Sequence, residues 1–402
     1  MKVERTTIPI KGFSSSGLHC GIRRKKKDLV LIMADQPVPT AGVFTKNKSC
    51  ASPVTLSKKH LINHMAQAII INSGNANACT GHQGKLDALH MAQTVANHAQ
   101  IDIDKVLVSS TGVIGLPLPM DNLQKGIPQC VAALQNGDFT DASEGILTTD
   151  TGNKTATLQY QIGGQTVSLT AIAKGSGMIH PNMATMLGFI MTDASIDGAS
   201  LQAYLGEVTQ DTFNMVSVDG DTSTNDMVIA MASGQSLAPP VDQTDAHGLL
   251  FKAALYQVCK DLAIQIASDG EGATKLLEVN LEGASSKEDA RKIAKSVVCS
   301  SLVKSAFFGN DANWGRIVCA MGYSGADYCS EDISVSIHSE AGTLSLMDKG
   351  APLPFNEAYA KDVLSQAHVQ VQITLNGGVF SATAWGCDLT YDYVKINGMY
   401  RT

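Results

Sequence analysis

The chain has 402 residues, of which 44% are apolar and 17% are charged, and its formal net charge is −7 at pH 7. This composition is typical of a globular protein with a substantial core and argues against a disordered chain. The acidic balance argues against a nucleic-acid-binding surface, which normally carries an excess of basic residues. The length leaves room for two or three packed units.

The sequence starts MKVERTTIPI, without the apolar core of a secretory signal, and no apolar run reaches the roughly 18 residues that a membrane span needs. The nine cysteines are scattered singly, a pattern that favours reduced thiols over a disulfide framework. Because they form no CxxC pair and no histidines stand at metal-ligand spacing, we expect no bound metal. These features predict a cytoplasmic protein.

The first half of the chain alternates short apolar runs with helical periodicity. Residues 86–99 repeat their apolar positions at helical spacing, and residues 155–173 have the pattern of a hairpin with Gly163 and Gly164 at its turn. Strands are predicted at 29–34, 67–74 and 105–110, where short apolar runs are bounded by polar or small residues. The basic run RRKKK, residues 23–27, precedes the first of them, and a solvated turn is the interpretation that its position favours.

The second half contains two long helical patterns among further strands. Residues 247–270 are the strongest helical segment, closed by Gly270, and residues 285–308 open at Ser286 with acidic residues in the first turn, as in a capping box. The remaining apolar segments predict strands at 185–194, 333–340, 369–385 and 389–400. The whole pattern predicts an α/β fold.

One stretch, KGSGMIHPNMATMLGFIMTDA at 174–194, combines a glycine-rich loop with an apolar strand and places Thr185 at the junction. A threonine at the head of a strand is usually structural. Here, however, the loop could present the Ala184 carbonyl to the Thr185 hydroxyl. A cut between them would give Thr185 a free α-amine with a reference pKa near 8, so that one residue would hold both nucleophile and base.

Along the chain, several short sequence blocks follow one another in this order: AGVFTKN, SGNANACTG, SSTGVIG, KGSGMIHPNMATML, SVDGDTSTNDM, SDGEGATK, WGR and the terminal YRT. With these blocks the whole chain resembles the glutamate N-acetyltransferase, or ornithine acetyltransferase, family of arginine biosynthesis. The resemblance implies a layered α/β/β/α sandwich of the ornithine acetyltransferase type with an N-terminal-nucleophile mechanism. It also implies a precursor that cuts itself between Ala184 and Thr185 into an alpha chain, 1–184, and a beta chain, 185–402.

The same resemblance implies an assembly and a reaction. Two alpha and two beta chains would form a heterotetramer, with the oxyanion hole in the alpha chain and the nucleophile in the beta chain. Thr185 would take the acetyl group from N2-acetylornithine, release ornithine and pass the acetyl group to glutamate. No metal or bound organic cofactor is implied. Acetyl-CoA is a possible second donor, which would make the enzyme bifunctional, and the sequence leaves this open.

Site residues also follow from the resemblance. Thr111 and Gly112, in SSTGVIG, would form the oxyanion hole, where a hydroxyl and a backbone N–H after a buried strand are reasonable donors. Substrate binding is implied for Thr151, Lys174, Thr185, Glu271, Asn397 and Thr402. Taken by its position alone, Lys174 could hold a carboxylate or lower the pKa of a nearby amine, or it could be an ordinary surface lysine.

Two further patterns have competing interpretations. Residues 219–226, DGDTSTND, resemble a calcium loop but have Thr224 at position six and Ala230 at position twelve, so we predict a hydrogen-bonded turn near the active site. His180 is given a structural or precursor-stage role.

The main alternative function is a self-cleaving aminopeptidase, which would transfer the acyl group to water. A binding protein that has lost the chemistry is the non-enzymatic alternative.

Overall fold

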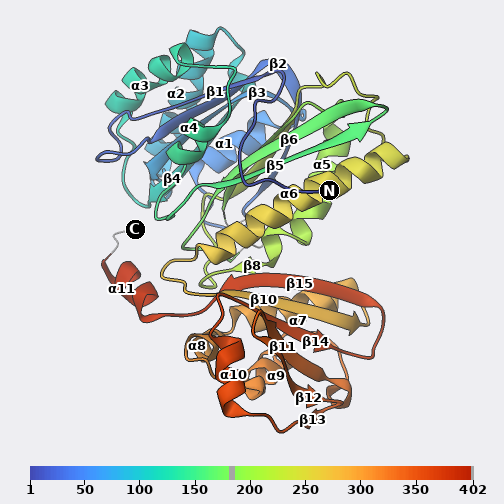
Figure 1. The fold of residues 1–402 in the computed structure, drawn as a ribbon. Coiled ribbons are helices and arrows are strands. Elements are labelled where there is room, and N and C mark those ends of the chain that lie inside the picture. The colour runs from blue at the N-terminus through green and yellow to red at the C-terminus, as the bar shows by residue number, and fades with distance from the viewer. Residues whose placement is uncertain (181–185, 400–402) are drawn as a thin grey trace.

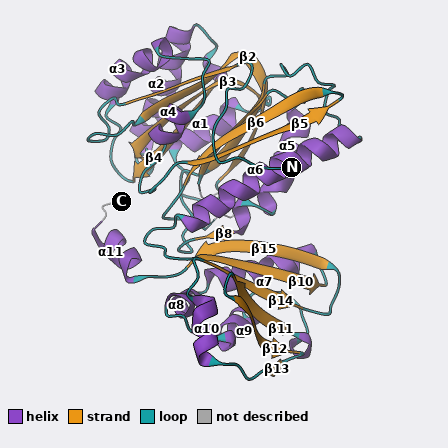
Figure 2. Cartoon of the chain, in the orientation of Figure 1, coloured by secondary structure: helices purple, strands orange, loops and turns teal. Residues whose placement is uncertain are grey.

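The computed structural model describes residues 1–180 and 186–399, so Ala184, Thr185 and Thr402 lie outside the described residues. Figure 1 shows two lobes, each built on a β-sheet, and Figure 2 shows helices on the outside of both. The upper lobe contains the larger sheet. The lower lobe contains the smaller sheet and most of the last third of the chain.

The larger sheet has eight strands in the order β4-β3-β2-β9-β7-β6-β5, with β1 paired to β2. Their bounds are β1 (Phe13–Leu18), β2 (Leu29–Phe44), β3 (Met65–Asn75), β4 (Val106–Val113), β5 (Lys154–Ile162), β6 (Gln165–Lys174), β7 (Leu187–Thr192) and β9 (Met227–Ala232). The register between β2 and β3 shifts between Met33 and Val38. Such an irregularity bends a strand, and it lets β2 pair with β1 and β3 in its first half and with β9 in its second.

The bend in β2 stacks the two halves of this sheet face to face. One buried cluster joins Ile69 and Leu107 of β3 and β4 to Phe189 and Ile229 of β7 and β9. Alternate residues of a strand point to opposite faces, so the neighbouring Ile70 packs outward against α2 (Gly81–Ala99) and α3 (Met120–Ala132). The outer face of the second layer is covered by α5 (Gly198–Gln210) and α6 (Ala246–Ser268). The predicted α/β/β/α layering is confirmed.

The lower lobe has seven strands in the order β13-β12-β11-β14-β10-β15-β8. Their bounds are β8 (Val216–Ser217), β10 (Leu276–Ala284), β11 (Ser334–Ser339), β12 (Gly342–Asp348), β13 (Ala351–Pro352), β14 (His368–Thr374) and β15 (Phe380–Cys387). The remaining helices are α1 (Ser52–His60), α4 (Thr140–Gly145), α7 (Lys287–Cys299), α8 (Ser301–Phe308), α9 (Trp314–Gly322), α10 (Glu357–Leu364) and α11 (Tyr391–Met399). Helix α7 packs on β10 and β15, whereas α6 contacts strands of both sheets and so joins the lobes.

The predicted cut separates in sequence the segments that build the larger sheet. Strands β7 and β9 follow residue 185 in sequence, yet β7 pairs with β6 and β9 pairs with β2. Segments 1–184 and 185–402 therefore both supply strands to this sheet. The division of the chain at 184/185 stays a prediction.

Three sequence predictions need correction or refinement. The predicted strand at 389–400 is wrong, because the chain forms helix α11 there, and the Thr390 hydroxyl accepts the Tyr393 N–H at 3.2 Å as an N-cap would. The predicted helix 285–308 is divided at Ser300, whose extended backbone ends α7 and whose hydroxyl caps α8. The apolar segment 369–385 forms two strands, β14 and β15, which do not pair with each other because β10 lies between them. Across the two described ranges, no helix is both long and apolar enough to span a membrane.

Candidate active site

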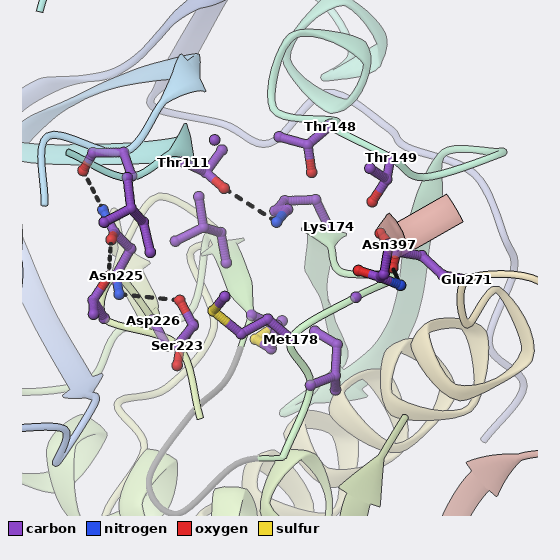
Figure 3. A pocket seen from close by; sticks show the side chains of 18 residues that line it. Thr111, Thr148, Thr149, Lys174, Met178, Ser223, Asn225, Asp226, Glu271 and Asn397 are labelled. Carbon is purple, nitrogen blue, oxygen red and sulfur yellow. Dashed lines mark hydrogen bonds between the residues drawn. The ribbon is translucent and has the colours of Figure 1, made fainter. Parts of the chain in front are cut away.

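A pocket lies where the ends of β4 and β6 meet the loops 175–180 and 219–226, and Asn397 of the last helix of the chain lines one side of it. Figure 3 shows Thr111 and Lys174 pointing toward one another in this pocket. Glu271 and Asn397 lie on one side of that pair, and Asp226 lies on the other. Residues that are far apart in sequence therefore converge on one cavity.

Thr111 and Gly112 lie near the end of β4, in parallel pairing with β3. Gly112 has φ +132°, and a β-carbon there would lie 2.3 Å from the carbonyl carbon of Gly74. Only glycine permits this approach, so the two strand ends pack closely enough to fix Thr111 in place. The Ser110 carbonyl accepts a hydrogen bond of 2.9 Å from Asn225, which ties the end of β4 to the 219–226 loop.

Lys174 is the last residue of β6, and its ammonium donates a hydrogen bond of 3.1 Å to the Thr111 hydroxyl. Burial lowers the pKa of Lys174 below its ordinary value, although the carboxylates of Asp150, Asp226 and Glu271 act in the opposite direction. The fold thus brings together two site residues, 63 positions apart, that the sequence analysis named separately.

Behind Lys174 lies a buried ionic network. The Asp150 carboxylate accepts hydrogen bonds of 2.7 Å from Lys154 and from the Gly175 N–H. Burial alone would raise the pKa of Asp150, but the charges of Lys154 and Lys174 outweigh it and lower this pKa to about 2. Lys154 also donates to Asp269 at 2.5 Å. The network holds the start of the 175–180 loop against the end of the long helix α6.

Thr151 takes part in this network rather than in the pocket. Its hydroxyl and backbone N–H both donate to Asp269, and its side chain faces a neighbouring cavity beside α11. Thr148 and Thr149, which the sequence analysis did not single out, line the pocket instead. The threonine repeat in TTDT was the available signal, but nothing in the sequence says which of its members turns inward.

Glu271 and Asn397 form the opposite side of the pocket. The Asn397 amide donates to the Glu271 carboxylate at 2.8 Å, and Glu271 is only 8% exposed. A β-carbon on Gly177 would lie 2.4 Å from this carboxylate, so the glycine makes room for it. Asn397 belongs to α11, and this contact brings the tail of the chain to the site. Thr402, also named from the sequence, lies outside the described residues.

Asp226 is a site residue that the sequence analysis missed. It is 3% exposed and lines the pocket, and one of its carboxylate oxygens finds no hydrogen-bond partner among the described residues. Burial raises the pKa of Asp226 well above its ordinary value, a shift that Ser223 and Lys174 only partly oppose. Asp226 lies immediately before β9, whose first N–H bonds the Met186 carbonyl at 3.1 Å. Asp226 is therefore close to the residue that follows Thr185 in sequence.

The 219–226 loop forms the predicted hydrogen-bonded turn and braces the glycine loop. The Asp219 carboxylate accepts the N–H groups of Met178 and Ile179 at 2.6 and 2.9 Å. His180 contacts the Ser217 hydroxyl at 3.1 Å and the Cys299 thiol at 3.3 Å and is not among the residues that line the pocket. Burial and the nearby Lys295 charge lower the pKa of His180 to about 4, so this imidazole is neutral near pH 7.

Comparisons with known proteins show to which family this chain belongs. The family model described as "ArgJ family" matches residues 14–402. The chain belongs to the ArgJ family. The "Arginine biosynthesis bifunctional protein ArgJ" of Symbiobacterium thermophilum is 50% identical over 394 residues, which cover 97% of each chain. The ArgJ of Caldanaerobacter subterraneus subsp. tengcongensis is 48% identical over 392 residues, covering 98% of this chain and 97% of the relative.

A solved ArgJ structure agrees with this membership. The chain in the crystal structure of ArgJ from Bacillus halodurans is 46% identical in sequence, with a TM-score of 0.50. The match covers 53% of this chain and 98% of the solved chain. The protein is therefore an ArgJ acetyltransferase of arginine biosynthesis. Within the described part of the chain, no group of three or more His, Cys, Asp or Glu side chains is arranged to hold a metal ion.

Proposed function

We propose that this protein is a self-cleaving enzyme that moves an acetyl group from N2-acetylornithine to glutamate through an acetyl-Thr185 intermediate. The observation that carries the proposal is the pocket itself. A hydroxyl with an ammonium behind it, Thr111 and Lys174, stands opposite a buried carboxylate, Glu271. Such a pocket offers an oxyanion donor, a cation and an anion to a substrate that is itself an amino acid.

Self-cleavage between Ala184 and Thr185 is the first step of the proposal. The loop before it depends on two glycines: Gly175 has φ +159°, and a β-carbon on Gly177 would lie 2.4 Å from the Glu271 carboxylate. The solved Bacillus halodurans chain gives further support, because the structural match spans 53% of this chain but 98% of the solved chain. A product running from 185 to 402 would make up a similar share.

In the transfer, the Thr185 hydroxyl oxygen attacks the acetyl carbonyl of acetylornithine and its proton passes to the Thr185 α-amine. The C–N bond then breaks, the proton goes to the departing ornithine amine, and the acetyl group stays on Thr185 as an ester. Glutamate then reverses these steps. Its amine attacks the ester, and the proton that this amine loses returns to the Thr185 oxygen through the same α-amine. Atoms and charge balance, because one amide is broken and another is formed.

Thr111 and Gly112 would stabilise the negative oxygen that forms at each attack. Because Lys174 donates to the Thr111 oxygen, the hydroxyl hydrogen of Thr111 remains available for the oxyanion. The ammonium also polarises that hydroxyl. A single donor of this kind is worth about 3 kcal/mol of transition-state stabilisation, or about a hundredfold in rate.

The charged groups of the pocket would hold the two substrates by their charged ends. Lys174 provides a cation for a substrate carboxylate, and Glu271 provides an anion for the side-chain ammonium of acetylornithine. Asn397 orients Glu271 from the tail. We also propose substrate contacts for Thr151, which donates to Asp269 beside the pocket, and for Thr402. We further propose an assembly of two alpha and two beta chains in the cytoplasm. No bound cofactor is required. The name "bifunctional" carried by the relatives supports acetyl-CoA as a second donor.

Incubation of the purified enzyme with acetylornithine, with and without glutamate, tests the proposal. We expect sustained release of ornithine only when glutamate is present, and about one equivalent per active site when it is absent. Thr185→Ala serves as the control for uncatalysed release. Sustained release of ornithine and acetate without glutamate would instead assign a hydrolase, as the aminopeptidase alternative requires.

A further inference from the structure

The turn between β1 and β2 carries a cluster of cations that the proposed acetylornithine reaction does not use. Figure 1 shows this turn in dark blue at the edge of the upper lobe. Arg24, Lys25 and Lys26 are exposed, and none of them forms an ion pair with any residue in the described ranges. The flanking Lys27, in contrast, is paired with Asp141 and Glu144. We refer to residues 19–28 as the basic turn.

Hydrogen bonds hold the backbone of the basic turn in a defined conformation. The buried Asp28 carboxylate accepts the N–H groups of Cys20 and Arg23 at 2.6 and 2.7 Å, which clamps both arms of the turn. The His19 ring lies 2.9 Å from the Lys26 carbonyl oxygen. A preorganised turn loses little entropy when a ligand binds its side chains. Arg24, Lys25 and Lys26 therefore stand next to one another on a turn whose backbone is held by hydrogen bonds.

Sheet register places this turn at the edge that carries the candidate active site. Leu29, the first residue after the turn, pairs with Asn72 of β3, and Asn72 pairs with Ser110 of β4. The Ser73 N–H also donates to the Asp28 carbonyl at 2.9 Å. Neighbouring strands lie about 4.8 Å apart, so Leu29, directly after the turn, lies roughly 10 Å, or two strand spacings, from Ser110, the residue before Thr111.

A direct contact joins the turn to the lining of the pocket. The Arg23 guanidinium donates to the carbonyl oxygens of Leu147 and Thr148 at 2.6 and 3.2 Å, and Thr148 lines the pocket. The Arg23 stem also packs on Gly74, where a β-carbon would lie 2.7 Å from it. Arg23 thus anchors the turn to the rim, and the three exposed cations follow it directly in sequence.

We propose that Arg24, Lys25 and Lys26 bind the phosphate groups of acetyl-CoA while its thioester reaches the pocket at Thr111. This inference rests on the second-donor part of the proposed function. The pantetheine arm separates the thioester of acetyl-CoA from its phosphates, so a pocket for the acetyl group needs a separate phosphate site beyond its rim. On a chain of net charge −7, a polyanion requires a local cluster of unpaired cations, and this turn provides one.

Acetylornithine has no phosphate, so it makes no use of the turn. The triple variant Arg24→Ala/Lys25→Ala/Lys26→Ala should therefore raise KM for acetyl-CoA about tenfold, as expected of three exposed charge contacts, with acetylornithine kinetics unchanged. A matched control removes three exposed lysines of the lower lobe, Lys292→Ala/Lys349→Ala/Lys361→Ala, and should leave both donors unaffected. Wild-type KM for acetyl-CoA should rise with salt more steeply than that of the triple variant.

Direct binding of CoA separates this inference from the proposed function. Isothermal titration should show that CoA binds the wild type and the control more tightly than the triple variant, and that dephospho-CoA, which lacks one phosphate, loses part of this difference. Should acetyl-CoA support no turnover, the second-donor proposal fails, while a binding difference would still assign the phosphate site. Equal CoA affinity for all three proteins, or binding by none, overturns the inference and leaves a solvated turn.

Discussion

The Lys174 ammonium and the Thr111 hydroxyl are joined by a hydrogen bond of 3.1 Å that links the ends of β6 and β4. These strands belong to the two stacked layers of the larger sheet, so the contact spans the opening between the layers. An ammonium behind a hydroxyl fixes which way the hydroxyl hydrogen can point. The geometry therefore prepares Thr111 as a donor before a substrate arrives, which is the preorganisation that oxyanion stabilisation requires.

The first prediction concerns that donor. Thr111→Val keeps the shape of the side chain but removes the hydroxyl, so kcat of the cleaved enzyme should fall by about a hundredfold to a thousandfold. Thr111→Ser keeps the hydroxyl and should retain most of the activity. Steady-state kinetics on fully cleaved samples make the measurement. Wild-type kcat in Thr111→Val, or a larger loss in Thr111→Ser than in Thr111→Val, would contradict the role of the hydroxyl as donor.

The second prediction uses the lowered pKa of Lys174. An ordinary lysine keeps its charge to about pH 10, but this one should lose it at a lower pH as the pH rises. KM for glutamate should therefore increase as the pH rises, and the increase should begin at a lower pH than the titration of an ordinary lysine would give. Arginine stays charged over the same rise in pH, so KM of Lys174→Arg should be flat. A wild-type KM that stays constant to pH 10 would contradict the carboxylate-binding role.

The sequence predicted the strands of the site better than its polar loops. Thr111 lies near the end of β4 and Lys174 ends β6, and the apolar runs of both buried strands are visible in the sequence. Asp226 was missed because its burial depends on the pairing of β9 with β7 and β2, which no local pattern reports. Helix α11 was mistaken for a strand because it buries none of its described side chains, so it has no apolar stripe at helical spacing.

The third prediction concerns stability. Asp150→Asn removes the carboxylate that pairs with the buried Lys154 and should lower the free energy of unfolding by about 3 kcal/mol at pH 7. The Asp150 pKa is depressed to about 2, so its stabilisation is present above about pH 4 and is lost as the pH falls toward 2. The difference between wild type and variant should shrink over that window.

Urea unfolding from about pH 7 down to about pH 2 measures this difference. The control is Asp141→Asn, an exposed carboxylate whose loss should change the unfolding free energy by less than about 1 kcal/mol. A difference for Asp150→Asn that did not change with pH would mean that packing, rather than charge, explains the effect.

The fourth prediction concerns the anionic side of the pocket. Glu271→Gln keeps the shape of the side chain and a carbonyl oxygen for Asn397, but removes the charge offered to the acetylornithine side chain. KM for acetylornithine should rise about ten- to a hundredfold, as expected for a lost charge-assisted contact. Deletion of Arg401 and Thr402 should act in the same direction and leave self-cleavage intact. An unchanged KM in both variants would remove the tail and Glu271 from the substrate site.

The most direct test of the central claim is the intact mass of the enzyme after brief exposure to acetylornithine without glutamate. The account predicts two fragments, 1–184 and 185–402, with the mass of one acetyl group added to the second. Adding glutamate should remove that mass, and Thr185→Ala should show only the uncut chain of 402 residues without acetyl. Cleavage at another bond, or a 185–402 fragment that never carries the acetyl group, would contradict Thr185 as the residue that transfers it.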